Sequence, residues 1–239
     1  MMIHQLAPPL LLDGDCRQVS CLFDGTLLQP DTADQLGLAL PVTLDKAVQK
    51  RKAEFLAGRY CARAALAQLD GSLAVNIGIG ANREPLWPPG FVGSITHTHG
   101  YASAIVARQA QVRALGLDSE SWIDAQKVAS VSPQILSPRD NHTGQMHLFD
   151  SPSHYLTLVF SAKESLFKCL FPLVNRFFDF QAAIITPLPG DSPSRGRFRF
   201  ELIKDLSTEF CAGYSGFGNY TLDTRCAHTA IVLRERRED

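Results

Sequence analysis

Apolar and polar residues follow one another along the chain in patterns that predict both strands and helices. A segment rich in Ala and Leu, residues 44–69, predicts a helix that ends at Asp70-Gly71, a frequent C-terminal signal. Other segments have the short apolar or alternating patterns of strands. The predicted strands are 17–23, 91–97, 101–108, 112–118, 178–185, 196–202 and 228–234. The chain therefore reads as an α+β protein.

A second helix is predicted in the stretch VFSAKESLFKCLFP. Ser161 and Glu164 have the spacing of a capping box, which would start the helix there. We favour an earlier start, with Ser151 as N-cap and Pro152 as the first helical residue, because more apolar positions then share one stripe. Pro172 would end this helix. The stripe consists of Leu156, Val159, Phe160, Lys163, Phe167, Leu170 and Phe171.

The arrangement of these segments suggests two parts. At 239 residues the chain is long enough for one large domain or two small ones. A change of pattern between Arg108 and Arg113 leads us to predict halves at 1–110 and 111–239. Residues 130–153 are rich in Ser, Pro, Asn, Asp and Gly, which is typical of a loop.

Charged residues interrupt the apolar stripe of the second helix. Lys163 falls at a core position, and Glu164 and Lys168 fall at the edge, four residues apart. A buried stem with its ammonium group in water would explain Lys163. A helix salt bridge worth about 0.2–0.5 kcal/mol would explain the other two. A bound ligand that pairs with these charges is the functional alternative.

Two further carboxylates lie at the end of a predicted strand. Asp118 and Glu120 are two residues apart, so their side chains point to the same side of the strand. Carboxylates that close repel each other, and a hard cation such as Mg²⁺ relieves the repulsion. Glu164 could supply a third oxygen ligand. A solvated turn is the structural alternative.

Basic residues that could bind phosphate lie in the first half. Guanidinium groups suit phosphate, although a solvated helix face is the alternative. His97 and His99 have no further ligand at a spacing typical of zinc, which leaves His97 as a phosphate contact or a structural residue. The candidates are Arg51, Lys52, Arg59 and Arg63 on the first helix, Arg83 on a proline-rich turn, and Ser94, Thr96 and His97 at a strand end.

Composition excludes several classes of partner. The formal net charge is −1, so no basic field indicates nucleic acid or an anionic membrane. No apolar run is long enough for a membrane span, and the N-terminus lacks the basic region of a signal peptide. The six cysteines show no C-x-x-C spacing, which favours a reduced, cytoplasmic protein. We expect a monomer.

Four segments, in order, resemble the motifs of the 4′-phosphopantetheinyl transferases. They are KRKAEFLAGRYCARAAL, REPLWPPGFVGSITH, GLDSE and FSAKESLFK, within residues 50–168, about half of the chain. The similarity is greatest to the siderophore-synthase type, named for enterobactin assembly. That family usually has an apolar residue where this chain has Ser119, a position that should not bind the metal. The C-terminal third is not diagnostic.

The resemblance implies a fold of two pseudo-symmetric α/β halves with the active site between them. It implies Mg²⁺-dependent transfer of the 4′-phosphopantetheine arm of coenzyme A to a serine of an apo carrier protein (peptidyl, aryl or acyl). Adenosine 3′,5′-bisphosphate would be released, and the pathway would be siderophore or other nonribosomal peptide or polyketide biosynthesis.

The resemblance also implies roles for particular residues. Asp118, Glu120 and Glu164 would bind Mg²⁺, and Glu164 is also the candidate base for the serine proton. Lys168 would neutralise the pyrophosphate, and Lys163 would do the same or support the site. The adenosine end and its 3′-phosphate would meet Arg51, Arg59, Arg83, Thr96 and His97.

Two other functions remain open at this point. A metal-dependent phosphohydrolase would cut coenzyme A or a nucleotide without a carrier protein. A non-catalytic coenzyme A-binding protein would need no carboxylates, and the intact set Asp118, Glu120, Glu164 and Lys168 argues against it. For a transferase, an acidic carrier protein should dock on an apolar ridge at Gln134, Ile135 and Leu136, with Arg139 beside it.

Overall fold

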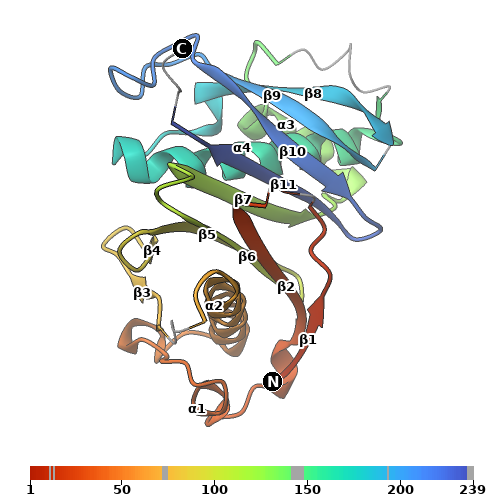
Figure 1. Ribbon diagram of the computed structural model, residues 1–239. Helices are drawn as coiled ribbons and strands as arrows, with labels where there is room; N and C mark the ends of the chain where they lie inside the picture. The colour runs from red at the N-terminus through yellow and green to blue at the C-terminus, as the bar shows by residue number, and fades with distance from the viewer. Residues whose placement is uncertain (11, 13, 72–74, 141–147, 193, 236–239) are drawn as a thin grey trace. The chain divides into compact units, whose positions relative to one another are not determined.

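The computed structural model describes residues 1–235 except 11, 13, 72–74, 141–147 and 193 (Figure 1). The chain divides into two compact units, one formed by Met1–Leu115 with the chain from Leu233, the other by Gly116–Val232. Each unit contains an antiparallel sheet and one long helix, which confirms the α+β class. The domain boundary predicted between residues 110 and 111 stays a prediction. The division into compact units falls after Leu115, inside strand β7 (Ala114–Ser121).

The first unit is a four-stranded sheet covered by α2 (Gln49–Leu69). Small residues of the helix, among them Ala53, Ala57 and Ala65, are fully buried against the sheet and let the two pack closely. The helix predicted for residues 44–69 thus forms from Gln49 and ends where expected. The strand order is β1 (Met2–Leu6), β2 (Cys16–Asp24), β6 (Tyr101–Arg108) and β5 (Phe91–Thr98).

Short elements complete the first unit. A two-stranded sheet pairs β3 with β4, and the remaining elements are single helical turns. Their bounds are β3 (Gly78–Ile79), β4 (Pro85–Leu86), η1 (Gly25–Leu27), α1 (Thr32–Gln35) and η2 (Val42–Leu44).

The second unit packs α4 (Pro152–Val174) against a five-stranded sheet (Figure 1). Ser161 and Ser165 of the helix bond to Thr229 in the sheet, at 2.9 and 2.7 Å between hydroxyl oxygens. The strand order is β7 (Ala114–Ser121), β11 (Cys226–Leu233), β10 (Ser215–Leu222), β9 (Arg195–Leu202) and β8 (Ala183–Ser192). The other elements are η3 (Ala125–Lys127), α3 (Val128–Ile135) and η5 (Phe180–Ala182).

The longer of the two predicted forms of the second helix is confirmed. Ser151 is the N-cap, and its side chain accepts the N–H of His154 at 3.2 Å. The prediction that Pro172 ends the helix is wrong, because α4 continues to Val174. Asn175 ends it instead, in the left-handed conformation with φ 47°. A proline this close to the C-terminus removes one hydrogen bond without breaking the helix.

Other predictions required correction. Residues 130–135 are helical, as part of α3, although the segment 130–153 was predicted as loop; residues 141–147 of it lie outside the described part. Strands β1 and β10 were not predicted. In β10 the glycines hide the strand pattern: a Cβ at Gly218 would lie 2.2 Å from the ring of Phe198 on β9. Glycine is required there because a cross-strand ring covers the backbone.

Candidate active site

Strand β7 and helix α4 approach each other closely at Gly116. A Cβ at this residue would lie 1.9 Å from the backbone oxygen of Ser165, so no other residue fits without moving the two elements apart. Alternation along the strand then directs Asp118 and Glu120 to the same face as Gly116, toward α4. Asp118 is buried and Glu120 is half-buried.

Lys168 of α4 contacts the strand at this point. Its Nζ donates to Asp118 Oδ1 at 2.6 Å and to the backbone oxygen of Leu117 at 3.2 Å. These bonds use two of the three N–H donors of the ammonium group, and the Lys168 side chain is 28% exposed, so a ligand can reach part of it. The structure therefore gives Lys168 an ion pair that joins α4 to β7, in place of the helix salt bridge to Glu164 considered from the sequence.

The carboxylates near Lys168 influence one another. Burial raises the pKa of Glu120 to about 8, and the charges of Asp118 and Glu164 add to the effect while Lys168 opposes it. Burial also raises the pKa of Glu164, with Lys168 opposing and Asp118 adding. The predicted acids thus lie within electrostatic range of each other and of Lys168.

This donor set fits a hard divalent cation. Carboxylate oxygens are the ligands that Mg²⁺ prefers, and a bound cation would offset the repulsion from Asp118 and Glu164, which adds to the effect of burial on the pKa of Glu120. Within the described part of the chain, the oxygens of the three acids do not all lie within 4.8 Å of one another.

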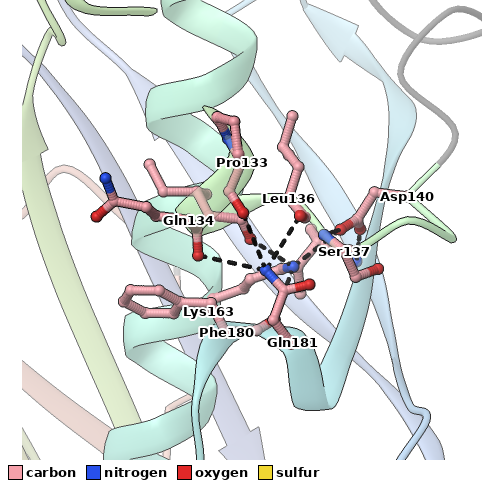
Figure 2. Close-up of polar contacts among 10 residues, drawn as sticks. Pro133, Gln134, Leu136, Ser137, Asp140, Lys163, Phe180 and Gln181 are labelled. Atoms are coloured by element: carbon pink, nitrogen blue, oxygen red, sulfur yellow. Dashed lines mark hydrogen bonds and ion pairs between the residues drawn. The ribbon is translucent and has the colours of Figure 1, made fainter. Parts of the chain in front are cut away.

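Lys163 lies in the interior and does not reach water. Its Nζ donates to the backbone oxygens of Ile135 and Phe180, at 2.8 and 2.9 Å, and to Asp140 Oδ2 at 2.9 Å (Figure 2). An ammonium group has three N–H donors, so these bonds use all of them. The expectation of a buried stem with a solvated ammonium is wrong, because the side chain is 2% exposed and a buried acid balances its charge.

Asp140 was not found from the sequence. Its Oδ1 accepts the N–H of Ile185 on β8 at 3.2 Å, and its Oδ2 also accepts the N–H of Ser137. The indication available was Lys163 itself, since a lysine at a core position needs a buried partner. The sequence offered many acids and no local spacing to choose among them.

The same network closes the C-terminus of α3 (Figure 2). Gln181 Nε2 donates to the backbone oxygens of Leu136 at 3.1 Å and Gln134 at 3.3 Å, and Lys163 Nζ donates to the backbone oxygen of Ile135. These are carbonyls that a helix end leaves without intrahelical partners. As a result, the end of α3, the following residues as far as Asp140, and the start of β8 are held together around Lys163. Lys163 directly precedes Glu164 in the sequence.

The apolar docking ridge expected at residues 134–136 is not a surface ridge. Ile135 is 5% exposed, Leu136 is half-buried, and only Gln134 is exposed. The substitution Ile135→Asp would therefore disturb the core rather than test docking. Arg139 is exposed, as expected.

An apolar cavity of about 180 Å³ lies beside Glu164. Phe167, Phe177 and Phe178 form much of its wall, and the Phe167 ring centroid lies 5.5 and 5.1 Å from those of the other two. Phe177 is 76% exposed, which is unusual for so large an apolar side chain. The cavity could take a slender, largely apolar chain whose end reaches Glu164.

In the first unit, Arg51 and His97 lie together. Arg51 Nη1 and His97 Nε2 are 2.9 Å apart, and Glu54 lies 3.8 Å from both side chains. Arg51 is exposed and His97 is half-buried, so the pair can be reached by an anion. Glu54, which the sequence did not single out, holds the two in place.

The other predicted basic residues differ in their surroundings. Arg59 is buried, donates to the backbone oxygen of Gly78 at 3.0 Å, and lines a cavity of about 350 Å³. Burial, and then the charge of Arg51, lowers the pKa of Arg59 to about 10. Arg83 is exposed on its turn, and Thr96 is buried. Arg63 donates to the backbone oxygens of Gly37, at 2.6 Å, and Leu36, which is a structural role.

His97 and His99 do not belong to a metal cluster in the described part of the chain. The group found there consists of Asp223, Cys226 and His228, whose ligand atoms lie within 4.8 Å of one another. None of the three was predicted from the sequence.

Two further expectations from the sequence concern membrane spans and cysteines. No helix in the described ranges is long and apolar enough to cross a membrane. The cysteines form no disulfide in this structure, and all but Cys211 are buried.

Family models match most of the chain. The model described as "4'-phosphopantetheinyl transferase N-terminal domain" matches residues 40–107. The model described as "4'-phosphopantetheinyl transferase superfamily" matches residues 114–224, which include all the acids around Lys168.

Curated relatives have names from the same family. The chain is 34% identical over 189 residues to 4′-phosphopantetheinyl transferase PptT of Mycobacterium tuberculosis, which is 79% of this chain and 82% of the relative. It is 39% identical over 141 residues to 4′-phosphopantetheinyl transferase Npt of Nocardia iowensis, 59% of this chain and 61% of the relative. It is 39% identical over 145 residues to enterobactin synthase component D of Salmonella typhi, 61% of this chain and 58% of the relative.

The chain thus spans about three-fifths of the length of Npt and of enterobactin synthase component D, and 82% of the length of PptT. The resemblance found in the motifs is confirmed by both family models and by relatives that include the enterobactin type. This chain belongs to the 4′-phosphopantetheinyl transferase superfamily.

Proposed function

We propose that this chain transfers the 4′-phosphopantetheine arm of coenzyme A to a serine of an apo carrier protein, with Mg²⁺ as cofactor. Adenosine 3′,5′-bisphosphate would be the second product, and the carrier would belong to siderophore or related nonribosomal peptide or polyketide assembly in the cytoplasm. The observation that supports this most is the ion pair of Lys168 with Asp118, placed beside the carboxylates of Glu120 and Glu164. Acids and an ammonium so arranged suit a metal-bound pyrophosphate.

Asp118, Glu120 and Glu164 would hold the Mg²⁺. When bound, the ion would draw negative charge from the pyrophosphate and so make the bisphosphate a better leaving group. Lys168 would direct its third N–H donor to the same phosphate oxygens, since Asp118 and the backbone oxygen of Leu117 accept the other two. Positioning and charge neutralisation of this kind supply most of the catalysis in phosphoryl transfer.

Glu164 is the group we assign to accept the serine proton. Burial raises the pKa of its carboxyl in the metal-free chain, whereas a bound Mg²⁺ would lower it, so the roles of base and metal ligand oppose each other in Glu164. Lys163, adjacent in sequence, has its donors directed at Asp140 and backbone oxygens, so we assign it to support of the site rather than to phosphate.

The cavity formed by Phe167, Phe177 and Phe178 would receive the pantetheine arm. The arm is slender, uncharged and bears apolar methyl groups, which suits an aromatic wall. Because Glu164 lines the same cavity, the phosphate that begins the arm would lie near the carboxylates.

The adenosine end would be bound by Arg51, Arg59, Arg83, Thr96 and His97. Arg83 offers the cleanest test because it is exposed and its loss should not disturb the core. If it contacts the 3′-phosphate, Arg83→Ala should weaken coenzyme A binding by about 1.5–3 kcal/mol, roughly 10- to 150-fold. Calorimetric titration would measure this.

Dephospho-coenzyme A is the matched ligand for that experiment, and its affinity should hardly change. Arg195→Ala, at an exposed arginine of β9, is the control variant and should leave both affinities as they are. Equal weakening of both ligands by Arg83→Ala would instead assign Arg83 to the pyrophosphate.

We propose that Arg139 contributes to carrier docking. Its side chain is 63% exposed, and an acidic partner would be attracted to such a charge mainly during encounter. Arg139→Glu should raise the KM for the carrier several-fold and weaken its dependence on salt, with the KM for coenzyme A unchanged. Steady-state kinetics at two ionic strengths would show this, and Arg195→Glu is the control. Unchanged carrier kinetics would place docking elsewhere.

The proposed activity is tested by mass spectrometry of apo carrier proteins after incubation with coenzyme A and Mg²⁺. A transferase would add the phosphopantetheine mass to the carrier. A phosphohydrolase would release that fragment to water, and a binding protein would leave coenzyme A intact. Either of the last two results would overturn the proposal.

A further inference from the structure

Ser119 lies between two of the proposed metal ligands and points away from them. Asp118 and Glu120 face α4, so the residue between them faces the opposite side of β7. There Ser119 is fully buried, and its Oγ lies 2.9 Å from Nδ1 of His228 on the neighbouring strand β11. A buried polar side chain inside the acidic motif is thus held by a polar partner.

The contact continues beyond His228. The His228 ring is 1% exposed, and its Nε2 lies 3.2 Å from Asp223 Oδ2. The other oxygen, Oδ1, accepts the backbone N–H groups of Arg225 at 2.7 Å and Cys226 at 2.8 Å. These two bonds fix the Asp223 carboxylate in the turn between β10 and β11. A hydrogen-bonded chain therefore runs from this turn to the middle of the acidic motif.

Both ring nitrogens of His228 have a hydrogen-bond partner. A neutral imidazole can donate from Nε2 to Asp223 and accept the Ser119 hydroxyl at Nδ1, and an imidazolium can donate to both. The arrangement is not that of a serine hydrolase. Ser119 is fully buried, and it meets the ring nitrogen that such enzymes use for the carboxylate.

The cluster of Asp223, Cys226 and His228 also has the composition of a metal site, but its groups are already engaged. Both oxygens of Asp223 accept hydrogen bonds. Burial raises the pKa of the Cys226 thiol to about 11, whereas a metal needs the thiolate. We therefore treat these residues as part of the hydrogen-bonded chain.

We propose that Ser119, His228 and Asp223 are positioning residues that hold the end of β7 so that Asp118 and Glu120 present their carboxylates to one cation. Cation binding requires both carboxylates in their charged form, in which Asp118 and Glu120 repel each other and favour rotation of the end of the strand. A bond on the opposite face of β7, at the residue between them, resists that rotation. The inference rests on the proposed function, because it assumes that the acids bind a divalent cation. Groups hydrogen-bonded directly to metal ligands commonly change metal affinity about 10- to 100-fold, and because Ser119 acts through the backbone we expect an effect at the lower end of that range.

The experiment is a titration of Mn²⁺ into the full chain with coenzyme A present, followed by electron paramagnetic resonance of the free ion. Ser119→Ala should raise the Kd for Mn²⁺ about 10-fold, with kcat at saturating metal close to that of the wild type. Ser119→Thr keeps the hydroxyl and should recover most of the affinity. Asp223→Ala, at a side chain that is 40% exposed, should shift the Kd in the same direction and tests the chain without loss of a buried residue.

Ser20→Ala is the matched control. Ser20 is also fully buried, and its Oγ lies 2.9 Å from that of Ser103 in the sheet of the first unit. It should lower Tm about as much as Ser119→Ala and leave the Kd for Mn²⁺ unchanged. If Ser119→Ala and Asp223→Ala both bound Mn²⁺ with the wild-type Kd, the inference would be overturned and the proposed function would stand. A wild-type chain that binds no Mn²⁺ and modifies no carrier would overturn the proposed function, and the inference with it.

Discussion

A Lys163→Met variant is expected to lose about 3–5 kcal/mol of folding free energy, the usual cost of removing one partner of a buried ion pair. The Asp140 side chain has no exposed surface, so its charge would stay buried without its counter-ion. The carbonyl oxygens of Ile135 and Phe180 would lose a donor at the same time. Urea denaturation monitored by circular dichroism would measure the loss.

Lys204→Met is the matched control for this variant. Lys204 pairs with Asp179 at 3.0 Å in the same unit, but both side chains are more than half exposed, and such pairs contribute at most about 1 kcal/mol. Below its melting temperature, Lys163→Met should still bind coenzyme A with nearly wild-type affinity. A variant that melts like the wild type but loses coenzyme A would show that Lys163 contacts the phosphates.

A Glu164→Gln variant is expected to lose the transfer activity about 10²- to 10⁴-fold, the range for removal of a general base. Its stability should equal or exceed that of the wild type. Burial raises the pKa of Glu164, which means that the folded protein disfavours the charged carboxylate, and the nearby charge of Asp118 adds to this. Mass spectrometry of the carrier and a thermal melt would give the two results.

Asp205→Asn provides the comparison, because Asp205 is an exposed acid of the same unit whose Oδ1 accepts the N–H of Ala212. It should leave transfer unchanged. If Glu164→Gln kept transfer within a few-fold of the wild type, Glu164 would be neither the base nor an essential metal ligand.

The elements that bring the acids together could be predicted from the sequence. Helix α4 has a clear cap at Ser151 and a regular apolar stripe, and both are local features. The pair Asp118 and Glu120 follows from strand alternation alone. Periodicity and caps depend on residues a few positions apart, which is why they can be read without a structure.

The supporting contacts could not be predicted in the same way. Asp140 lies 23 residues from Lys163, and His228 lies 109 residues from Ser119. Such pairs depend on which strands become neighbours, and no local spacing encodes that. Strand β10 was hidden for a related reason: its glycines accommodate rings from β9, so the pattern has meaning only with the partner strand in place.

Gly116 carries no charge, yet it determines where the charged groups of the site lie. Because any side chain there would meet the Ser165 backbone oxygen, the distance between β7 and α4 is set by a missing methyl group. The 2.6 Å contact of Lys168 with Asp118 spans that same interface two residues along the strand. Exchange of one charged residue would remove one function and leave the others in place. Exchange of Gly116 would widen the whole interface and misalign the ammonium and carboxylates together, so this small residue is the least replaceable member of the group.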